Sequence, residues 1–182
     1  MAQKQASSNP YLALPLKYGL VGAALSIALF FVLLLLDENP LINGALFSFF
    51  FIPIFVFFAI KEFKKYYSAG TLHFWQGMTI GFGTYMILGL VSALFIWLYL
   101  QAIDPQLLLE YIADRVALMD GSKENLIDRL GQDTYETSLA NVQGATALDL
   151  ALDDFLRKIF AGFFITTIIS VVMRQRPLTI KN

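Results

Sequence analysis

Residues 72–103 read LHFWQGMTIGFGTYMILGLVSALFIWLYLQAI, and this stretch decides the fold. It lies in a longer interval, between Lys65 and Asp104, that contains no Asp, Glu, Lys or Arg. Because an α-helix rises about 1.5 Å per residue, roughly 20 residues cross the ~30 Å hydrocarbon layer of a bilayer. The stretch exceeds that length and contains no proline, so we predict a tilted or protruding membrane-spanning helix over 72–103.

The composition of the whole chain is that of a membrane protein. Its 182 residues are 57% apolar and 15% charged, whereas soluble domains average about 45–50% apolar and about 25% charged. The charged residues cluster between long apolar runs. The net charge of −1 gives no indication of a nucleic-acid partner. The absence of cysteine excludes disulfides, thiol nucleophiles and thiolate metal ligands.

Three further apolar runs predict three more spans. Tyr18–Leu36 is uncharged and longer than the ~7–15 residues of a secretory signal core, so a retained helix is favoured over a signal peptide. Leu41–Ile60 overlaps the end of an acidic turn at Asp37–Asn43, and Ile159–Met173 is shorter, at about 15 residues. We expect the side-chain stems of Arg157, Lys158 and Arg174 to snorkel and extend this last span. The four predicted spans are about 18–36, 41–60, 72–103 and 155–173.

Residues 104–154 form the only substantial polar region between the spans. Asp104-Pro105 is a typical helix start, with Asp as the N-cap and proline at the first helical position. A second short helix is expected to stop at Gly131, and 133–146 is expected to be irregular. The predicted fold is therefore an all-α, polytopic membrane protein with four transmembrane helices and a short helical extracytoplasmic insert between helices three and four.

The distribution of Lys and Arg predicts the orientation. Cytoplasmic loops carry an excess of these residues. Eight of the thirteen lie in the N-terminal segment, the connection at 61–65 and the C-terminal tail, whereas residues 104–158 hold eleven of the fourteen Asp and Glu. We therefore expect a multi-pass protein with both termini in the cytoplasm and the acidic insert outside.

Small residues indicate where the helices approach each other. Gly77-x-x-x-Gly81, with Gly89 further along, lies on the central helix, and small residues allow close helix contact in lipid. Packing within the bundle is the favoured interpretation, and a homodimer face is the alternative. The predicted helix-packing residues are Gly19, Gly22, Gly77, Gly81, Gly89 and Gly162.

Aromatic and polar side chains at the ends of the spans indicate their depth, because amphipathic rings favour the headgroup level. His73 is the only histidine, and an interfacial anchor is favoured over a ligand or a proton relay. The predicted interface anchors are Tyr66, His73, Trp75, Trp97 and Tyr99.

Catalytic constellations are missing from the sequence. It has one histidine, no cysteine, no phosphate-binding loop and no HExxH motif, so most nucleophilic and metal chemistry lacks its components. Asp149, Asp153 and Asp154 could bind a cation, but a solvated helix start favoured by the helix dipole is the better interpretation. We predict no catalytic, cofactor-binding or metal-binding residues, and no enzyme activity.

The layout resembles an uncharacterised, mostly bacterial family of small four-helix integral membrane proteins, grouped as a domain of unknown function. The resemblance rests on FFAIKEFKKYYSAGTLHFWQGMTIGFG at 57–83, on IDP at 103–105, and on the acidic insert before a short last span closed by Arg and Lys. It implies a location in the bacterial inner membrane. It supplies no activity and no catalytic residues.

Three classes of function remain open. A structural or interaction protein acting through helix packing and its acidic insert is favoured, with the lipid bilayer and either a second copy or another membrane protein as partner. A subunit of a small-molecule transporter or channel would need Gln76, Thr79, Thr84, Ser92 and Thr166 to converge on a cavity. A lipid-modifying enzyme would need a polar cluster such as His73 with Gln76.

Overall fold

The computed structural model describes residues 9–174, with side chains for all of these except 43–48. The regular elements in this range are all helices. In chain order they are α1 (Pro10–Leu35), α2 (Pro40–Tyr66), α3 (Phe74–Leu98), the π-helix η1 (Tyr99–Ile103), α4 (Pro105–Gly121), α5 (Lys123–Leu130), α6 (Gln132–Gln143) and α7 (Ala147–Met173).

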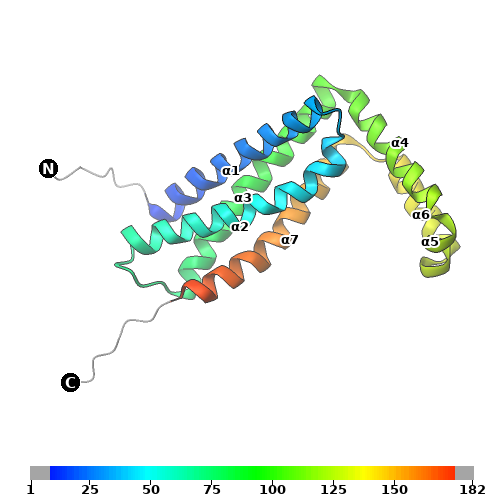
Figure 1. The fold of residues 1–182 in the computed structure, drawn as a ribbon. Helices are drawn as coiled ribbons and strands as arrows, with labels where there is room; N and C mark the ends of the chain where they lie inside the picture. Colours follow the sequence, from blue (N-terminus) through cyan, green and yellow to red (C-terminus); the bar gives the residue numbers. More distant parts are fainter. Residues whose placement is uncertain (1–8, 175–182) are drawn as a thin grey trace, which may run out of the picture.

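The four long helices α1, α2, α3 and α7 lie side by side as a bundle (Figure 1). The most extensive contacts are those of α3 with α1 and with α7, and α2 contacts all three of the others. We call the end of the bundle from which α4 departs the arm end. The opposite end, where α1 begins and α7 stops, is the tail end (Figure 1).

Three of the described helical segments are long and apolar enough to cross a membrane. They are α1, the continuous run of α3 and η1, and α7, with lengths of 26, 30 and 27 residues. At about 1.5 Å per residue these lengths give roughly 39–45 Å of helix, against a hydrocarbon layer of ~30 Å. The predicted all-α class and the presence of membrane-spanning-type helices are therefore confirmed.

Three helices begin with the same local device, an Asn or Asp N-cap followed by proline. The side chain of Asn9 accepts a hydrogen bond from Tyr11 N at 3.0 Å, and Asn39 caps α2 in the same way. Asp104 Oδ1 accepts from Leu107 N at 3.2 Å, which confirms the helix start expected at Asp104-Pro105. Proline fits the first helical position because its missing N–H would have no partner within the helix.

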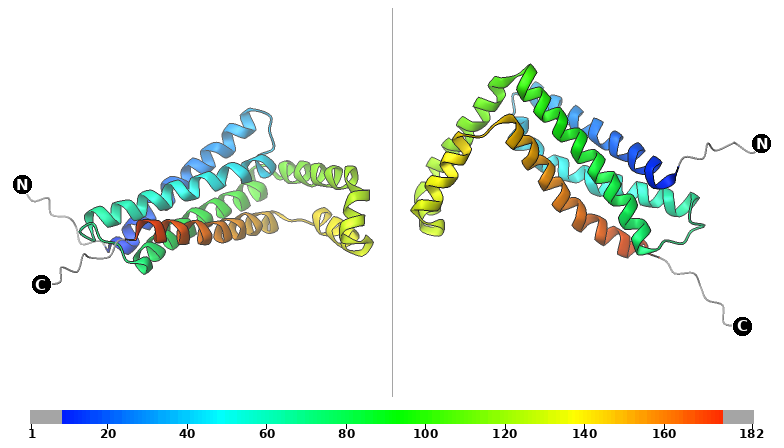
Figure 2. Two further views of the ribbon diagram at one scale, coloured as in Figure 1. Left: turned by 60° about the horizontal axis from the view of Figure 1, so that its bottom comes forward. Right: turned by 180° about the vertical axis from the view of Figure 1, so that it is seen from behind.

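Helices α4, α5 and α6 form an arm that leaves the bundle at the arm end and turns away from it (Figure 2). Within the arm, α6 packs beside α4 and α5. Tyr135 of α6 is buried, and its hydroxyl donates to Asp120 Oδ1 at 2.9 Å. Burial and this hydrogen bond raise the pKa of the Tyr135 phenol. At its base the arm joins a small apolar cluster that includes Phe30, Leu100 and Leu107.

The helical boundaries correct three expectations. Residues 133–146 are mostly helical, in α6, because packing against α4 and α5 supplies the order that its polar sequence does not. The basic group at Lys61–Lys65 lies in α2 rather than in a loop, since that helix continues to Tyr66. The central helix begins at Phe74, not at 72, and its last turn, from Tyr99, is π-helical.

The six glycines predicted to mediate helix packing all face neighbouring helices within the chain. A Cβ atom added to any of them would lie unusually close to a side chain of another helix. The tightest sites are on α3 and α7, where Gly81 faces Thr166 and Gly162 faces the ring of Tyr85. The remaining pairs are Gly19 with Ile87, Gly22 with Leu88 and Phe55, Gly77 with Ser170, and Gly89 with Phe155.

Gly81→Ile should lower the thermal stability of the protein in detergent. A Cβ at this position would lie 2.3 Å from Thr166 Cγ2, and Thr166 is fully buried, so α3 and α7 must separate. Overpacking of this kind costs about 1–3 kcal/mol, which should reduce the midpoint of thermal unfolding, followed by circular dichroism, by several degrees.

Gly121→Ala is the matched control. Gly121 ends α4, and an added Cβ would meet nothing within 4 Å, so we expect no decrease in its unfolding midpoint. Equal midpoints for Gly81→Ile and the wild type would contradict the close α3–α7 contact.

Candidate functional site

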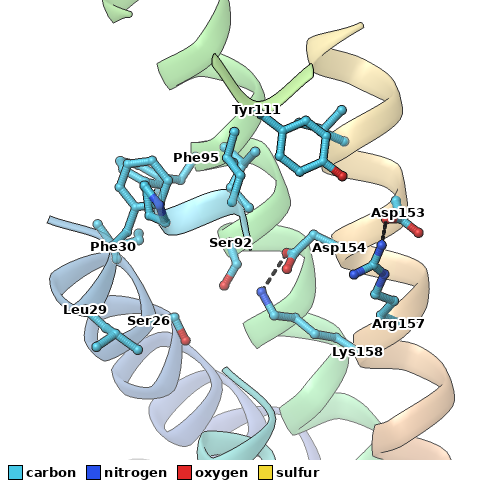
Figure 3. Close-up of a pocket in the computed structure, with 15 residues that line it drawn as sticks. Ser26, Leu29, Phe30, Ser92, Phe95, Tyr111, Asp153, Asp154, Arg157 and Lys158 are labelled. Carbon is cyan, nitrogen blue, oxygen red and sulfur yellow. Dashed lines mark hydrogen bonds and ion pairs between the residues drawn. The ribbon is translucent and has the colours of Figure 1, made fainter. Parts of the chain in front are cut away.

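A half-open pocket lies at the arm end of the bundle, among α1, α3 and α7 (Figure 3). Its cavity volume is about 60 Å³, whereas about 10–15 Å³ is enough to hold one water molecule. The start of α2 and one side chain of α4 close part of its rim. The residues that line it are Ser26, Ile27, Leu29, Phe30, Pro40, Leu41, Ser92, Phe95, Ile96, Tyr111, Leu150, Asp153, Asp154, Arg157 and Lys158.

The ammonium group of Lys158 is buried in this pocket. The residue is 2% exposed, and its Nζ lies 2.6 Å from Asp154 Oδ2, one helical turn earlier on α7 (Figure 3). Asp154 is the one residue in the described part of the chain that accepts a hydrogen bond from Lys158. The neighbouring Arg157 pairs instead with Asp153, and both of those side chains are substantially exposed. The expectation that Lys158 snorkels to water is therefore wrong.

The direction of Lys158 follows from its position on α7. The buried residues of that helix form one stripe facing the bundle: Ala147, Ala151, Lys158, Gly162, Thr166 and Ser170. Their spacing of four or seven residues places them on a single helix face. Apart from Lys158, the stripe consists of small residues, which bring α7 close to α3. Lys158 is drawn into the bundle because its Cα lies on the face that packs.

The stripe also shows how Lys158 could have been found from the sequence. The apolar run Ile159–Met173 begins just after Lys158, so Lys158 was expected to snorkel from the start of the last span. A helical projection of α7 places Lys158 in line with Gly162, Thr166 and Ser170, and Arg157 one position off it. The burial of Lys158 was therefore indicated by the face of small residues on α7, and not by the length of the apolar run.

Hydroxyl groups and aromatic rings complete the pocket. Ser26 Oγ donates to Gly22 O at 3.0 Å, and Ser92 Oγ donates to Leu88 O at 2.8 Å. Both hydroxyls have thus used their donor within their own helix, and their oxygens remain available as acceptors. The rings of Phe30 and Phe95 meet edge to face, with centroids 5.2 Å apart. The pocket therefore combines a charged and hydroxylated side with an aromatic side.

The polar residues that a transport path would need do not converge. Ser92 lines the pocket, but Thr84 bonds to Ile80 O within α3, and Thr166 packs against Gly81. Thr79 is exposed, and its hydroxyl donates to Trp75 O. Gln76 lies at the tail end, where it caps α3 together with His73. One of the five side chains thus reaches the pocket.

The predicted interface anchors lie at both ends of the bundle. At the tail end Tyr66 is exposed, and the exposed ring of Trp75 stacks on Tyr11. The side chain of His73 forms a capping box with Gln76 at the start of α3. Towards the arm end, Trp97 is exposed.

Tyr99 differs from the other anchors because its ring is buried. It lies 5.0 Å from the ring of Phe30 and 5.7 Å from that of Phe95. The expectation that its ring faces outward, like the rings of the other anchors, therefore does not hold. Its ring lies in the π-helical turn and packs against α1 instead of facing lipid.

The tail end carries a second charged cluster. Glu62 of α2 accepts hydrogen bonds from Lys17 Nζ at 2.7 Å and from Tyr18 Oη at 2.5 Å, which joins α2 to α1. Lys64 Nζ donates to Met173 O at 3.0 Å and so caps the end of α7. These contacts hold the ends of α1, α2 and α7 together. None of their residues lines a pocket found among the described residues.

The described residues contain no group of three or more His, Cys, Asp or Glu side chains that could hold a metal ion. The three acids at the start of α7 each have a local partner. Asp149 forms a capping box with Thr146, while Asp153 and Asp154 pair with Arg157 and Lys158. The pocket could therefore recognise a charged group through the buried ammonium of Lys158 and the carboxylate of Asp154.

Lys158→Met should destabilise the protein more than Arg157→Met does. Removing the ammonium leaves the mostly buried Asp154 carboxylate without its partner, and breaking a buried pair in this way costs about 3–5 kcal/mol, less where water still reaches the remaining group. Because Arg157 and Asp153 are exposed, their pair should contribute about 1 kcal/mol or less. Thermal unfolding in detergent measures both, and Asp154→Leu combined with Lys158→Met should recover most of the loss. Equal midpoints for the two single variants would contradict the burial of Lys158.

Comparison with known proteins gives a family but no activity. A family model described as "Protein of unknown function (DUF4199)" matches residues 17–175. Neither the curated proteins nor the solved structures contain a significant match. The matched range begins within α1, ends just beyond α7, and includes the arm and the pocket. The chain therefore belongs to the DUF4199 family.

Proposed function

We propose that the protein crosses the bacterial inner membrane four times, with α2 as the span additional to α1, α3 and α7. This helix has 27 residues and contacts the other three. Between Leu41 and Ile60 it carries no charged residue. Because α2 packs beside three helices that are long and apolar enough to cross the membrane, we expect it to lie in the same lipid layer as they do.

The proposed orientation places both termini and the tail end in the cytoplasm and the arm outside. Lys61, Lys64 and Lys65 lie in the last turns of α2, where Glu62 pairs with Lys17 of α1 and Lys64 bonds to Met173 at the end of α7, next to Arg174. The arm carries eight acidic and three basic side chains between Asp104 and Gln143. An excess of Lys and Arg favours the cytoplasmic face.

Single cysteines provide a test of this orientation, since the chain has no native cysteine. Lys123→Cys lies on the exposed arm and Lys65→Cys on the exposed end of α2. A membrane-impermeant maleimide should label Lys123→Cys in intact cells from which any outer membrane has been permeabilised. Lys65→Cys should react only after the inner membrane is opened. The opposite order of labelling would refute the proposed orientation.

The function that the geometry supports best is that of a non-enzymatic interaction subunit that presents its arm to a partner. The single observation that carries this proposal is the arm itself. Helices α4–α6 pack on one another and join the bundle at their base. They leave Leu109, Leu118 and Leu130 more than half exposed, so these apolar side chains are accessible to a partner. An element that the bundle does not need for its own core is available for contact.

The charge of the arm indicates the partner. With acids outnumbering bases by eight to three between Asp104 and Gln143, two arms would repel each other, whereas a basic surface would be attracted. The packing glycines are also occupied within the chain and offer no free homodimer face. We therefore propose another membrane protein, with a basic region outside the membrane, as the partner.

Photocrosslinking in cells tests this proposal. A photoreactive residue at Leu118 should give one discrete heterologous adduct, and the same residue at Leu94, exposed on α3, is the control that should crosslink to lipid only. Replacing Glu110 and Asp114 by Gln and Asn should reduce the Leu118 adduct several-fold. An adduct with twice the mass of the chain, or none at Leu118, would contradict the proposal.

A subunit of a small-molecule transporter or channel is the second candidate. The buried Lys158–Asp154 pair favours it, because ionisable residues inside membrane proteins often mark a substrate or ion path. The packing beyond the pocket opposes it. On the tail side of Ser92, α3 carries the fully buried side chains of Ile80, Tyr85 and Leu88. These side chains pack inside the bundle where a path from the pocket would have to continue. The interaction subunit is therefore the better-supported function.

A further inference from the structure

The four charges at the pocket have a fixed order along α7. Asp153 and Asp154 come one helical turn before Arg157 and Lys158. Four residues of α-helix correspond to about 6 Å of rise, and α7 runs from the arm end into the bundle (Figure 1). The Cα atoms of both acids therefore lie nearer the arm end than those of both bases, and the Lys158 ammonium lies on the deeper side of the Asp154 carboxylate, 2.6 Å from it (Figure 3). This order does not depend on which face of the membrane the arm occupies.

The charges at the pocket sum to zero, and this restricts what can enter. A ligand with a single charge would leave an uncompensated charge in a site where Lys158 is 2% exposed, which is strongly unfavourable. A zwitterion differs because its anion can pair with the lysine while its cation pairs with the aspartate. Every charge then keeps a partner of opposite sign.

The pair has hydrogen-bonding capacity left for such a ligand. The ammonium has three N–H donors, and its one hydrogen bond among the described residues goes to Asp154. The carboxylate can accept several further hydrogen bonds. The oxygens of Ser26 and Ser92, whose donors bond to their own helices, add acceptors on the facing walls.

The size of the pocket fits a headgroup rather than a whole molecule. Its volume of about 60 Å³ corresponds to about four to six water-sized positions at roughly 10–15 Å³ each, and the pocket is half open. The rest of the ligand must lie outside, beside membrane-spanning helices. An amphiphile whose hydrocarbon chains remain in the lipid meets this requirement. The apolar side chains of Leu29, Phe30 and Phe95 line the pocket and can contact the segment that joins its chains to its headgroup.

We propose that the pocket binds the headgroup of a zwitterionic phospholipid with a primary ammonium group. In such a lipid the phosphate lies next to the hydrocarbon chains and the ammonium lies nearer to water. This is the order in which α7 presents Lys158 and Asp154. The phosphate accepts from Lys158 and the ammonium donates to Asp154. A primary ammonium fits better than a quaternary one because it can donate hydrogen bonds to the carboxylate and the serines.

Native mass spectrometry of the full chain tests this proposal. The protein is purified in mild detergent and exposed to an equimolar mixture of phosphatidylethanolamine, phosphatidylcholine and phosphatidylglycerol with identical acyl chains. We expect the wild type to retain phosphatidylethanolamine about tenfold more than phosphatidylglycerol, the ratio expected from one charge-assisted hydrogen bond. Equal retention of all three lipids, or equal retention of phosphatidylethanolamine and phosphatidylglycerol, would overturn the proposal.

The double variant D154K/K158D is the sharpest comparison. It keeps an ion pair between the same two positions but inverts the order of charges, so the preference should fall to about equal retention. Lys65→Met, at the tail end, is the control that should keep the wild-type preference. A double variant that still prefers phosphatidylethanolamine would overturn the assignment of phosphate to Lys158.

Two further measurements keep the result decisive if the double variant does not fold. Ser92→Ala removes one acceptor from the pocket without adding volume, and it should reduce the preference for phosphatidylethanolamine about two- to threefold. Soluble glycerophosphoethanolamine, which has the headgroup but no chains, should not displace the retained lipid at an equal concentration. An unchanged preference in Ser92→Ala, or displacement by the soluble headgroup, would overturn the lipid site.

Discussion

The close approach of α3 to α1 and α7 is the contact on which the rest of the structure depends. Membrane helices gain little from burying apolar surface against each other, because lipid chains are apolar too, so their association relies on packing. Gly77 and Gly81 bring Ser170 and Thr166 of α7 against the backbone of α3, and Gly162 accepts the ring of Tyr85. The small residues alternate between the two helices, which holds α7 to α3 along much of its length.

The buried ion pair is a consequence of that contact. Lys158 belongs to the same face of α7 as Gly162 and Thr166, so the packing that brings these residues to α3 also carries the lysine inward. Asp154, one turn earlier, lies where it can compensate the charge at 2.6 Å. Breaking such a pair is unfavourable because it leaves one charge without a partner. The bundle therefore ends in a polar pocket instead of a closed apolar core.

The arm is joined to this pocket and is otherwise separate from the bundle. The π-helical turn at Tyr99–Ile103 and the cap at Asp104 end the central helix and redirect the chain into α4. Tyr111 of α4 contributes to the rim of the pocket, and Leu107 packs at the base of the arm. Binding at the pocket and contact through the arm would thus share one structural element, the first turns of α4.

The sequence by itself determined the all-α class, the presence of helices long and apolar enough to cross a membrane, and the start of α4 at Pro105. Local composition decides these features: uncharged length sets a span, and Asn or Asp before proline sets a helix start. The glycine spacing on residues 77–89 indicated a packing face but not the residues that meet it. The helix at Gln132–Gln143 was missed because its order comes from contact with α4 and α5 rather than from its own residues.

Only the tertiary structure decided where Lys158 and Tyr99 point. Both lie at the ends of apolar runs, where the sequence is equally consistent with a side chain that reaches water. The direction depends on which face of the helix packs against its neighbours, and that face is set by pairing between residues far apart in the chain. The pocket has the same origin, since Ser26, Ser92 and Lys158 come from three helices and meet only when the bundle is assembled.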